Sequence, residues 1–157
     1  MGNHNILAYV GLRNSFSIIE IMTSKYGNLK KALPAILLGF LLITLLDGVS
    51  SIASRQLNFN YGSLFPLALI IYTAVPFYIS KMYDSKMAII SGGLLGLFDS
   101  TIGWIISILL KANIGNRKLV LTPVIVILTI IFVTILSTLL GLLGSWLAKK
   151  SSPKKGN

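Results

Sequence analysis

Residues 88–110 read AIISGGLLGLFDSTIGWIISILL, an apolar run whose only charged side chain is Asp99. A bilayer core about 30 Å thick needs roughly 20 consecutive, mostly apolar residues in a helix, so this stretch predicts a membrane span. An acidic residue at the centre of such a helix costs about 2.5 to 3.5 kcal/mol on insertion scales. The stretch therefore predicts a membrane protein. It also indicates that some interaction must offset the free-energy cost of placing Asp99 in the membrane.

The rest of the chain repeats this apolar character. Of its 157 residues, 54% are hydrophobic and 11% are charged, whereas soluble domains are about 25% charged. Four apolar runs are long enough to span a bilayer, at residues 32–54, 64–80, 88–110 and 121–148. We expect an all-α integral membrane protein with four transmembrane helices. Pro76 predicts a kink or an early end in the second of them.

The two ends differ from the spans in composition. In residues 1–31, apolar side chains recur loosely at helical spacing between charged ones, which predicts an amphipathic helix in the headgroup region. A frayed arm that orders only against the bundle is the alternative. Residues 149–157 read KKSSPKKGN, which is typical of a disordered basic tail. We expect both basic ends to contact anionic lipid headgroups.

The positions of the lysines and arginines predict the orientation, because positive flanks are retained on the cytoplasmic side. Ten of the 14 lie in the N-terminal segment, the loop after the second span and the tail, and the other two loops hold the rest. This predicts that both termini are cytoplasmic. The layout is shared by many small four-span bacterial proteins, so we expect a multi-pass protein of the bacterial cytoplasmic membrane.

Several classes of site are excluded or disfavoured by composition. The chain has no cysteine and a single histidine, His4, so disulfides and clusters of cysteine and histidine around a metal are excluded. The formal charge of +10 falls between and around the apolar runs, with no nucleic-acid-binding motif. No phosphate-binding loop or nucleophile with a base partner is present. We expect no cofactor, no nucleic-acid partner and no enzymatic activity.

Two acids lie within the predicted spans, Asp47 in the first and Asp99 in the third. No lysine, arginine or histidine lies deep in any span, so neither acid has a cationic partner at membrane depth. An aspartyl-protease dyad is one hypothesis for such a pair. Intramembrane proteases of that type carry a GxGD signature, and here Phe98 replaces its second glycine, which disfavours this reading.

Small side chains surround both acids at helical spacing. Residues three and four apart share a helix face, so each acid points toward a neighbouring helix or water and away from lipid. Small residues on the fourth span predict the surface that packs against these faces. The expected helix-packing residues are Gly92, Gly96, Gly103, Ser137, Gly141 and Ser145.

Two functions remain open from the sequence. In the first, an oligomeric transporter or channel moves protons or cations along a polar path made by Asp47, Asp99, Ser50, Ser51, Ser100, Thr101 and Ser107. In the second, the acids are hydrogen-bonded contacts of a non-transporting subunit that docks the helices of a membrane-protein partner. A bundle this small encloses little volume, so transport would favour a homo-oligomer.

The aromatic residues predict anchoring rather than chemistry. Tyr61, Tyr83 and Trp146 lie near loop ends, where the aromatic belt is found. Trp104, one turn past Asp99, is expected to pack at a helix contact. Tyr72 and Tyr78 are candidates either for hydroxyls on the polar path or for anchors of the second span.

Overall fold

The computed structural model is an all-α membrane protein. It describes the backbone of residues 4–115 and 122–151, and the side chains of residues 29–115 and 122–151. Four helical segments in these ranges are long and apolar enough to cross a membrane: Leu29–Gln56, Tyr61–Met82, Ser85–Leu109 and Pro123–Ser151. The predicted four-span architecture is confirmed, with each boundary moved by a few residues.

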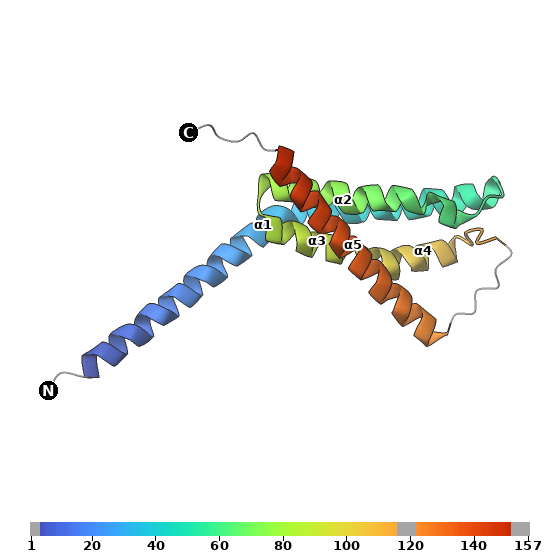
Figure 1. Cartoon of the computed structure of the whole chain (residues 1–157). Coiled ribbons are helices and arrows are strands. Elements are labelled where there is room, and N and C mark those ends of the chain that lie inside the picture. The colour runs from blue at the N-terminus through green and yellow to red at the C-terminus, as the bar shows by residue number, and fades with distance from the viewer. Residues whose placement is uncertain (1–3, 116–121, 152–157) are drawn as a thin grey trace.

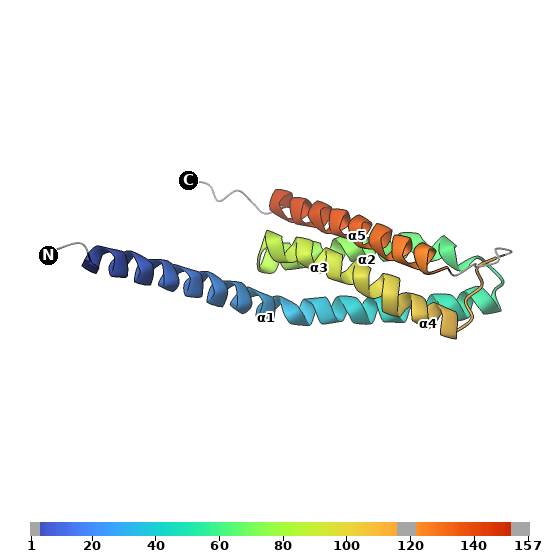
Figure 2. The same ribbon diagram turned by 90° about the horizontal axis from the view of Figure 1, so that it is seen from below.

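The first span is the C-terminal part of a much longer helix. Helix α1 runs without a break over His4–Gln56, and 53 residues correspond to about 80 Å, far more than a bilayer core requires. Its N-terminal half extends away from the other helices (Figures 1 and 2). The side chains of residues 4–28, on which the predicted amphipathic face depends, lie outside the described residues.

The second span combines a short 3₁₀ turn, η1 (Tyr61–Leu64), with helix α2 (Phe65–Met82). Asn60 caps η1, because its side-chain oxygen accepts a hydrogen bond from the Gly62 N–H at 2.9 Å. Helix α2 passes through Pro76 and continues to Met82, so the early end considered for this span does not occur.

The third span changes its helical geometry midway. It consists of α3 (Ser85–Phe98), the π-helical segment η2 (Asp99–Gly103) and α4 (Trp104–Leu109). The fourth span is α5 (Pro123–Ser151), which continues past the expected boundary at residue 148. Lys149 and Lys150 are therefore helical, and residues 152–157 of the predicted tail lie outside the described residues.

Helix α5 packs against α2, α3 and η2, and its N-terminal half diverges from α4 (Figure 1). Helix α1 packs against α2 and against the whole third span. The core at these contacts includes Tyr72, Ile79, Leu95 and Ile43, all fully buried. The outer faces carry leucine, isoleucine and valine, as expected of helices whose surroundings are lipid.

Candidate functional site

The two intramembrane acids meet inside the bundle. Asp47 comes from α1 and Asp99 begins η2, and both carboxyl groups reach the backbone of Gly103. A Cβ atom at Gly103 would collide with Oδ2 of Asp47 and would lie 2.6 Å from Oδ1 of Asp99. The absence of a side chain at Gly103 therefore makes the space that the two carboxyls occupy.

Two tyrosines hold the pair from the second span. The Tyr61 hydroxyl, in η1, donates a hydrogen bond to Oδ1 of Asp47 at 2.5 Å. The Tyr72 hydroxyl, in α2, donates a hydrogen bond to Oδ2 of Asp99. Oδ2 of Asp47 is buried and has no hydrogen-bond partner among the described residues, although the side chain is only 5% exposed. Its neighbour at Gly103 is Oδ1 of Asp99, so the two carboxyls face each other and one proton placed between them would be shared.

The π-helical geometry of η2 determines where Asp99 lies. The N–H of Trp104 bonds to the carbonyl oxygen of Asp99, five residues earlier, in place of the four-residue spacing of an α-helix. The single π turn adds one residue to the helix at this point, and it changes the direction of the side chains that follow relative to those that precede it. Such π segments occur frequently at functional sites.

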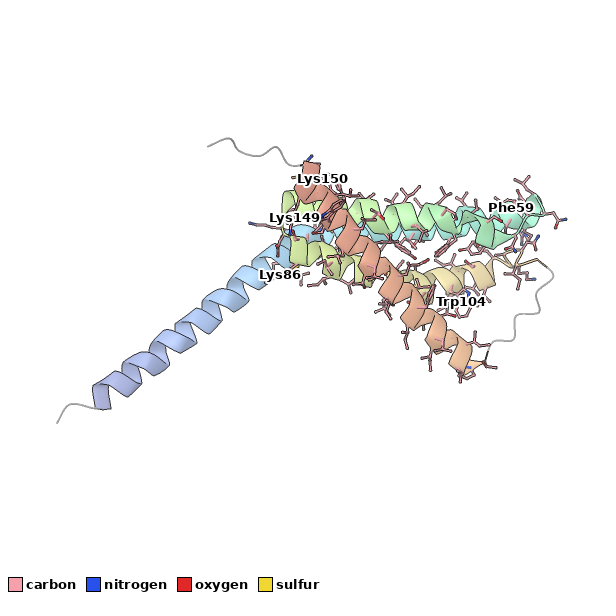
Figure 3. The ribbon with its side chains drawn as sticks, in the orientation of Figure 1. Phe59, Lys86, Trp104, Lys149 and Lys150 are labelled. Atoms are coloured by element: carbon pink, nitrogen blue, oxygen red, sulfur yellow. The ribbon has the colours of Figure 1, made fainter. Side chains whose placement is uncertain are left out.

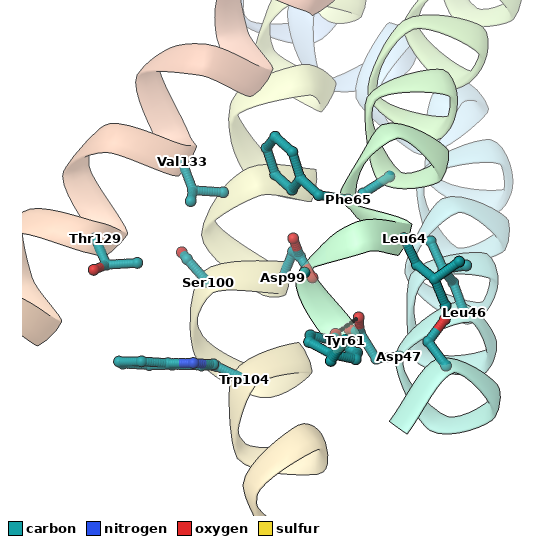
Figure 4. Close-up of a pocket in the computed structure, with 13 residues that line it drawn as sticks. Leu46, Asp47, Tyr61, Leu64, Phe65, Asp99, Ser100, Trp104, Thr129 and Val133 are labelled. Carbon is teal, nitrogen blue, oxygen red and sulfur yellow. Dashed lines mark hydrogen bonds between the residues drawn. The ribbon is translucent and has the colours of Figure 1, made fainter. Parts of the chain in front are cut away.

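A cavity of about 160 Å³ lies beside the carboxyls, with α5 forming one wall (Figure 4). Its lining residues come from all four spans. They are Leu46, Asp47, Ser50, Tyr61, Gly62, Leu64, Phe65, Ala68, Asp99, Ser100, Trp104, Thr129 and Val133. We call it the carboxyl cavity.

A second cavity, of about 240 Å³, lies toward the loops that connect the first span to the second and the third to the fourth. It shares Tyr61 and Trp104 with the carboxyl cavity and is also lined by Ser107 and Lys111. Figure 3 shows Trp104 in the half of the bundle that contains Phe59, away from Lys86, Lys149 and Lys150. The two aromatic side chains therefore form the boundary between the two cavities.

The bundle is closed on the opposite side of the carboxyls. The rings of Phe40 and Phe98 stack with centroids 4.3 Å apart, and Ile43 and Leu95 beside them are fully buried. Between the acids and the end that carries Lys86, Lys149 and Lys150, the interior is filled mostly by apolar side chains, with the buried Ser91, Ser137 and Ser145 among them.

The structure brings together some of the hydroxyls expected near the acids and separates others. Ser50 and Ser100 line the carboxyl cavity, and Ser107 lines the second cavity. The Thr101 hydroxyl donates to the Leu97 carbonyl of its own helix at 2.6 Å, and Thr101 lines neither cavity. Ser51 is fully buried but also lines neither.

The expected packing residues form a close contact between α3 and α5, which we call the α3–α5 seam (Gly92, Gly96, Ser137 and Gly141). A Cβ atom at Gly92 would lie 2.7 Å from the Ser137 carbonyl oxygen and 2.9 Å from Cα of Gly141. Further along α5, the Ser145 hydroxyl lies 3.1 Å from the Ser80 hydroxyl of α2. Gly103 is placed differently, because it faces the two carboxyls and not α5.

Tyr61 and Trp104 are the members of the site that sequence reasoning missed. The sequence predicts Tyr61 in the aromatic belt and Trp104 at a helix contact, and the structure shows that both also line the carboxyl cavity. Of the two tyrosines expected to supply a hydroxyl or to anchor their helix, Tyr72 donates a hydrogen bond to Asp99. Tyr78 is 51% exposed and lines neither cavity, and no sequence signal distinguishes it from Tyr72.

Comparison with protein-family models, with curated proteins and with solved structures found no match to this chain.

Proposed function

We propose that this protein carries protons or small cations across a membrane, and that the carboxyls of Asp47 and Asp99 take them up and release them. The observation that carries the proposal is the convergence of two acids from separate helices on Gly103. Two ionised carboxyls repel strongly in a medium of low dielectric constant, and a proton or cation between them relieves that repulsion. A site of this kind binds and releases positive charge.

The two cavities support a route to the acids. The second cavity lies at the loop end of the bundle and meets the carboxyl cavity at Tyr61 and Trp104. On the other side of the acids the stacked rings of Phe40 and Phe98 pack against the buried core. A central site that is reached from one end and closed at the other fits one state of an alternating-access cycle.

We assign the closed end to the cytoplasm. Lys86, Lys149 and Lys150 gather at that end of the bundle (Figure 3), and basic flanks are retained on the cytoplasmic side. The second cavity then faces away from the cytoplasm, and ions from that side would reach Asp47 first past Tyr61. We further propose that the protein acts as a homo-oligomer, because the two cavities beside the acids are small.

A second candidate function is that of a non-transporting subunit that docks a partner protein. It is favoured by helix α1, whose N-terminal half leaves the bundle and offers a long segment outside it (Figure 2). In that case the acids would serve as hydrogen-bonded contacts that fix helix packing.

The test is the flux of protons and of alkali cations into liposomes that contain the purified protein. We expect Asp47→Asn and Asp99→Asn each to lower the flux at least about tenfold, because asparagine keeps the shape but cannot exchange a charge. Asp84→Asn is the matched control, since Asp84 makes no capping hydrogen bond and lines neither cavity. Its flux should equal that of the wild type.

Each variant is first checked for the oligomeric size of the wild type. Unchanged flux in correctly assembled Asp47→Asn and Asp99→Asn variants would contradict the proposal. If no form conducts and the two substitutions alter assembly, the docking function is supported.

A further inference from the structure

We infer that the carboxyl cavity binds a small organic ammonium ion that has at least one N–H group and one compact apolar group. The inference deepens the proposed function, on which it rests, by naming the class of cation.

The charge of the cavity selects a cation. Among the described residues that line it, Asp47 and Asp99 carry the only carboxyl groups, and none is a lysine, arginine or histidine. Among the described residues that line the two cavities, the basic side chain is that of Lys111, and it lines only the second cavity. An anion would meet two carboxyls and no basic group.

The two carboxyls select an ion that can donate hydrogen bonds. Oδ2 of Asp47 has no hydrogen-bond donor among the described residues and lies with Oδ1 of Asp99 against Gly103, and both acids line the cavity. Ionised carboxylates accept hydrogen bonds and donate none, so a cation that enters beside them is held best if it donates to them. An ammonium N–H donates a charge-assisted bond to a carboxylate, whereas a quaternary ammonium has no N–H.

The remaining walls select an organic ion over a metal ion. Alkali and alkaline-earth cations require a shell of several oxygens. Here the walls away from the carboxyls are mostly apolar, with Leu46, Leu64, Phe65, Ala68 and Val133 among them. Tyr61 and Trp104 add aromatic rings, which attract organic cations through their π faces. Polar anchors set in an otherwise apolar wall are typical of small-molecule sites.

The volume limits the ligand to a compact molecule. At about 160 Å³ the cavity is smaller than the roughly 300 to 1,000 Å³ of drug-sized sites. It is close to the ~150 Å³ of an engineered cavity that binds benzene. A single ring or a short branched alkyl group beside the ammonium would fill it.

The probe is benzylammonium, with benzyl alcohol as its neutral analogue and benzyltrimethylammonium as the analogue without an N–H. Binding to the full chain in lipid nanodiscs is measured by calorimetry and by tryptophan fluorescence. The chain has two tryptophans, and Trp146 is 54% exposed and lines neither cavity. A Trp146→Phe background therefore leaves Trp104 as the reporter in the cavity wall.

We expect saturable binding of benzylammonium, at least tenfold weaker binding of both analogues, and a loss of at least tenfold in Asp47→Asn. Asp84→Asn should bind as the wild type does. Thr129→Phe is a second variant that fills the cavity without removing a charge, and it should also abolish binding. This variant keeps the test decisive if Asp47→Asn does not fold.

Equal binding of benzyl alcohol, or full binding in Thr129→Phe, would overturn the inference. The inference and the proposed function fail separately. Specific benzylammonium binding without any flux supports the inference and contradicts transport. Flux of protons or alkali cations that depends on Asp47, without benzylammonium binding, supports transport and overturns the inference.

Discussion

The α3–α5 seam and the carboxyl cavity are both built around glycine, but glycine has opposite effects in the two places. At the seam, Gly92 faces the backbone of α5, and the missing side chain allows the two helices to touch. Beside the cavity, Gly103 faces the ends of two acidic side chains, and the missing side chain makes room for them. A glycine that faces another backbone allows two helices to pack closely, whereas a glycine that faces polar side chains leaves space for them.

The largest effect is expected from a substitution at the α3–α5 seam. Gly92→Ala places a Cβ atom 2.7 Å from a backbone oxygen that cannot move without the whole helix. Overpacking of this kind typically costs 1 to 3 kcal/mol, so we expect the free energy of unfolding to fall by about 2 kcal/mol. The measurement is unfolding in mixed detergent micelles, followed by circular dichroism.

Gly48→Ala is the matched control, because no atom lies within 4 Å of a Cβ built at Gly48. It should unfold as the wild type does or be slightly more stable, since alanine has the higher helix propensity. Equal destabilisation by both substitutions would show that helix propensity, and not the seam contact, controls stability.

The same substitution at the cavity should change function more than stability. In Gly103→Ala the new methyl group meets the carboxyl ends of Asp47 and Asp99, which can rotate away. We expect the free energy of unfolding to change by less than about 1 kcal/mol, since the strain relaxes through side chains. Ion flux into liposomes should fall about tenfold, because the carboxyls no longer converge.

A fall in stability as large as that of Gly92→Ala, with flux intact, would contradict this reading of Gly103. It would mean that the third span cannot adjust around η2. The carboxyl pair would then be a packing element of the bundle.

A smaller effect is expected at the boundary between the cavities. Tyr61→Phe removes the hydrogen bond to Oδ1 of Asp47 and keeps the aromatic ring. Hydrogen bonds to charged groups contribute about 1.5 to 3 kcal/mol and neutral ones about 1 kcal/mol. We expect a severalfold change in flux, and Tyr78→Phe, at an exposed position, as a control without effect. Equal changes in the two variants would rule out a specific role for Tyr61.

The smallest effect is expected where α2 meets α5. Ser145→Ala removes the hydroxyl that lies 3.1 Å from the Ser80 hydroxyl. Hydrogen bonds between helices in membranes average about 0.6 kcal/mol, so the loss of unfolding free energy should be near that value. A double-mutant cycle with Ser80→Ala measures the pair, and a coupling energy of zero would show that the two hydroxyls do not interact.

The extent to which the site could be predicted differs between its residues. The sequence predicts that Asp47 and Asp99 avoid lipid, because an acidic side chain is costly to expose to lipid and because small residues share their helix faces. That they meet at Gly103 did not follow, because helix periodicity gives a face but not the neighbour opposite it. The π turn of η2 has no sequence signature, and a one-residue change of register moves Asp99 relative to every other helix.

By itself the sequence determined the class of this protein, its four spans and the two acids that must be sheltered, because hydrophobic length and the cost of burying charge act on each segment separately. Only the tertiary structure decided that the acids pair, that Tyr61 and Tyr72 donate to them, and that a cavity lies beside them. These features depend on how the four helices pack and cross, which arises from contacts between residues far apart in the chain.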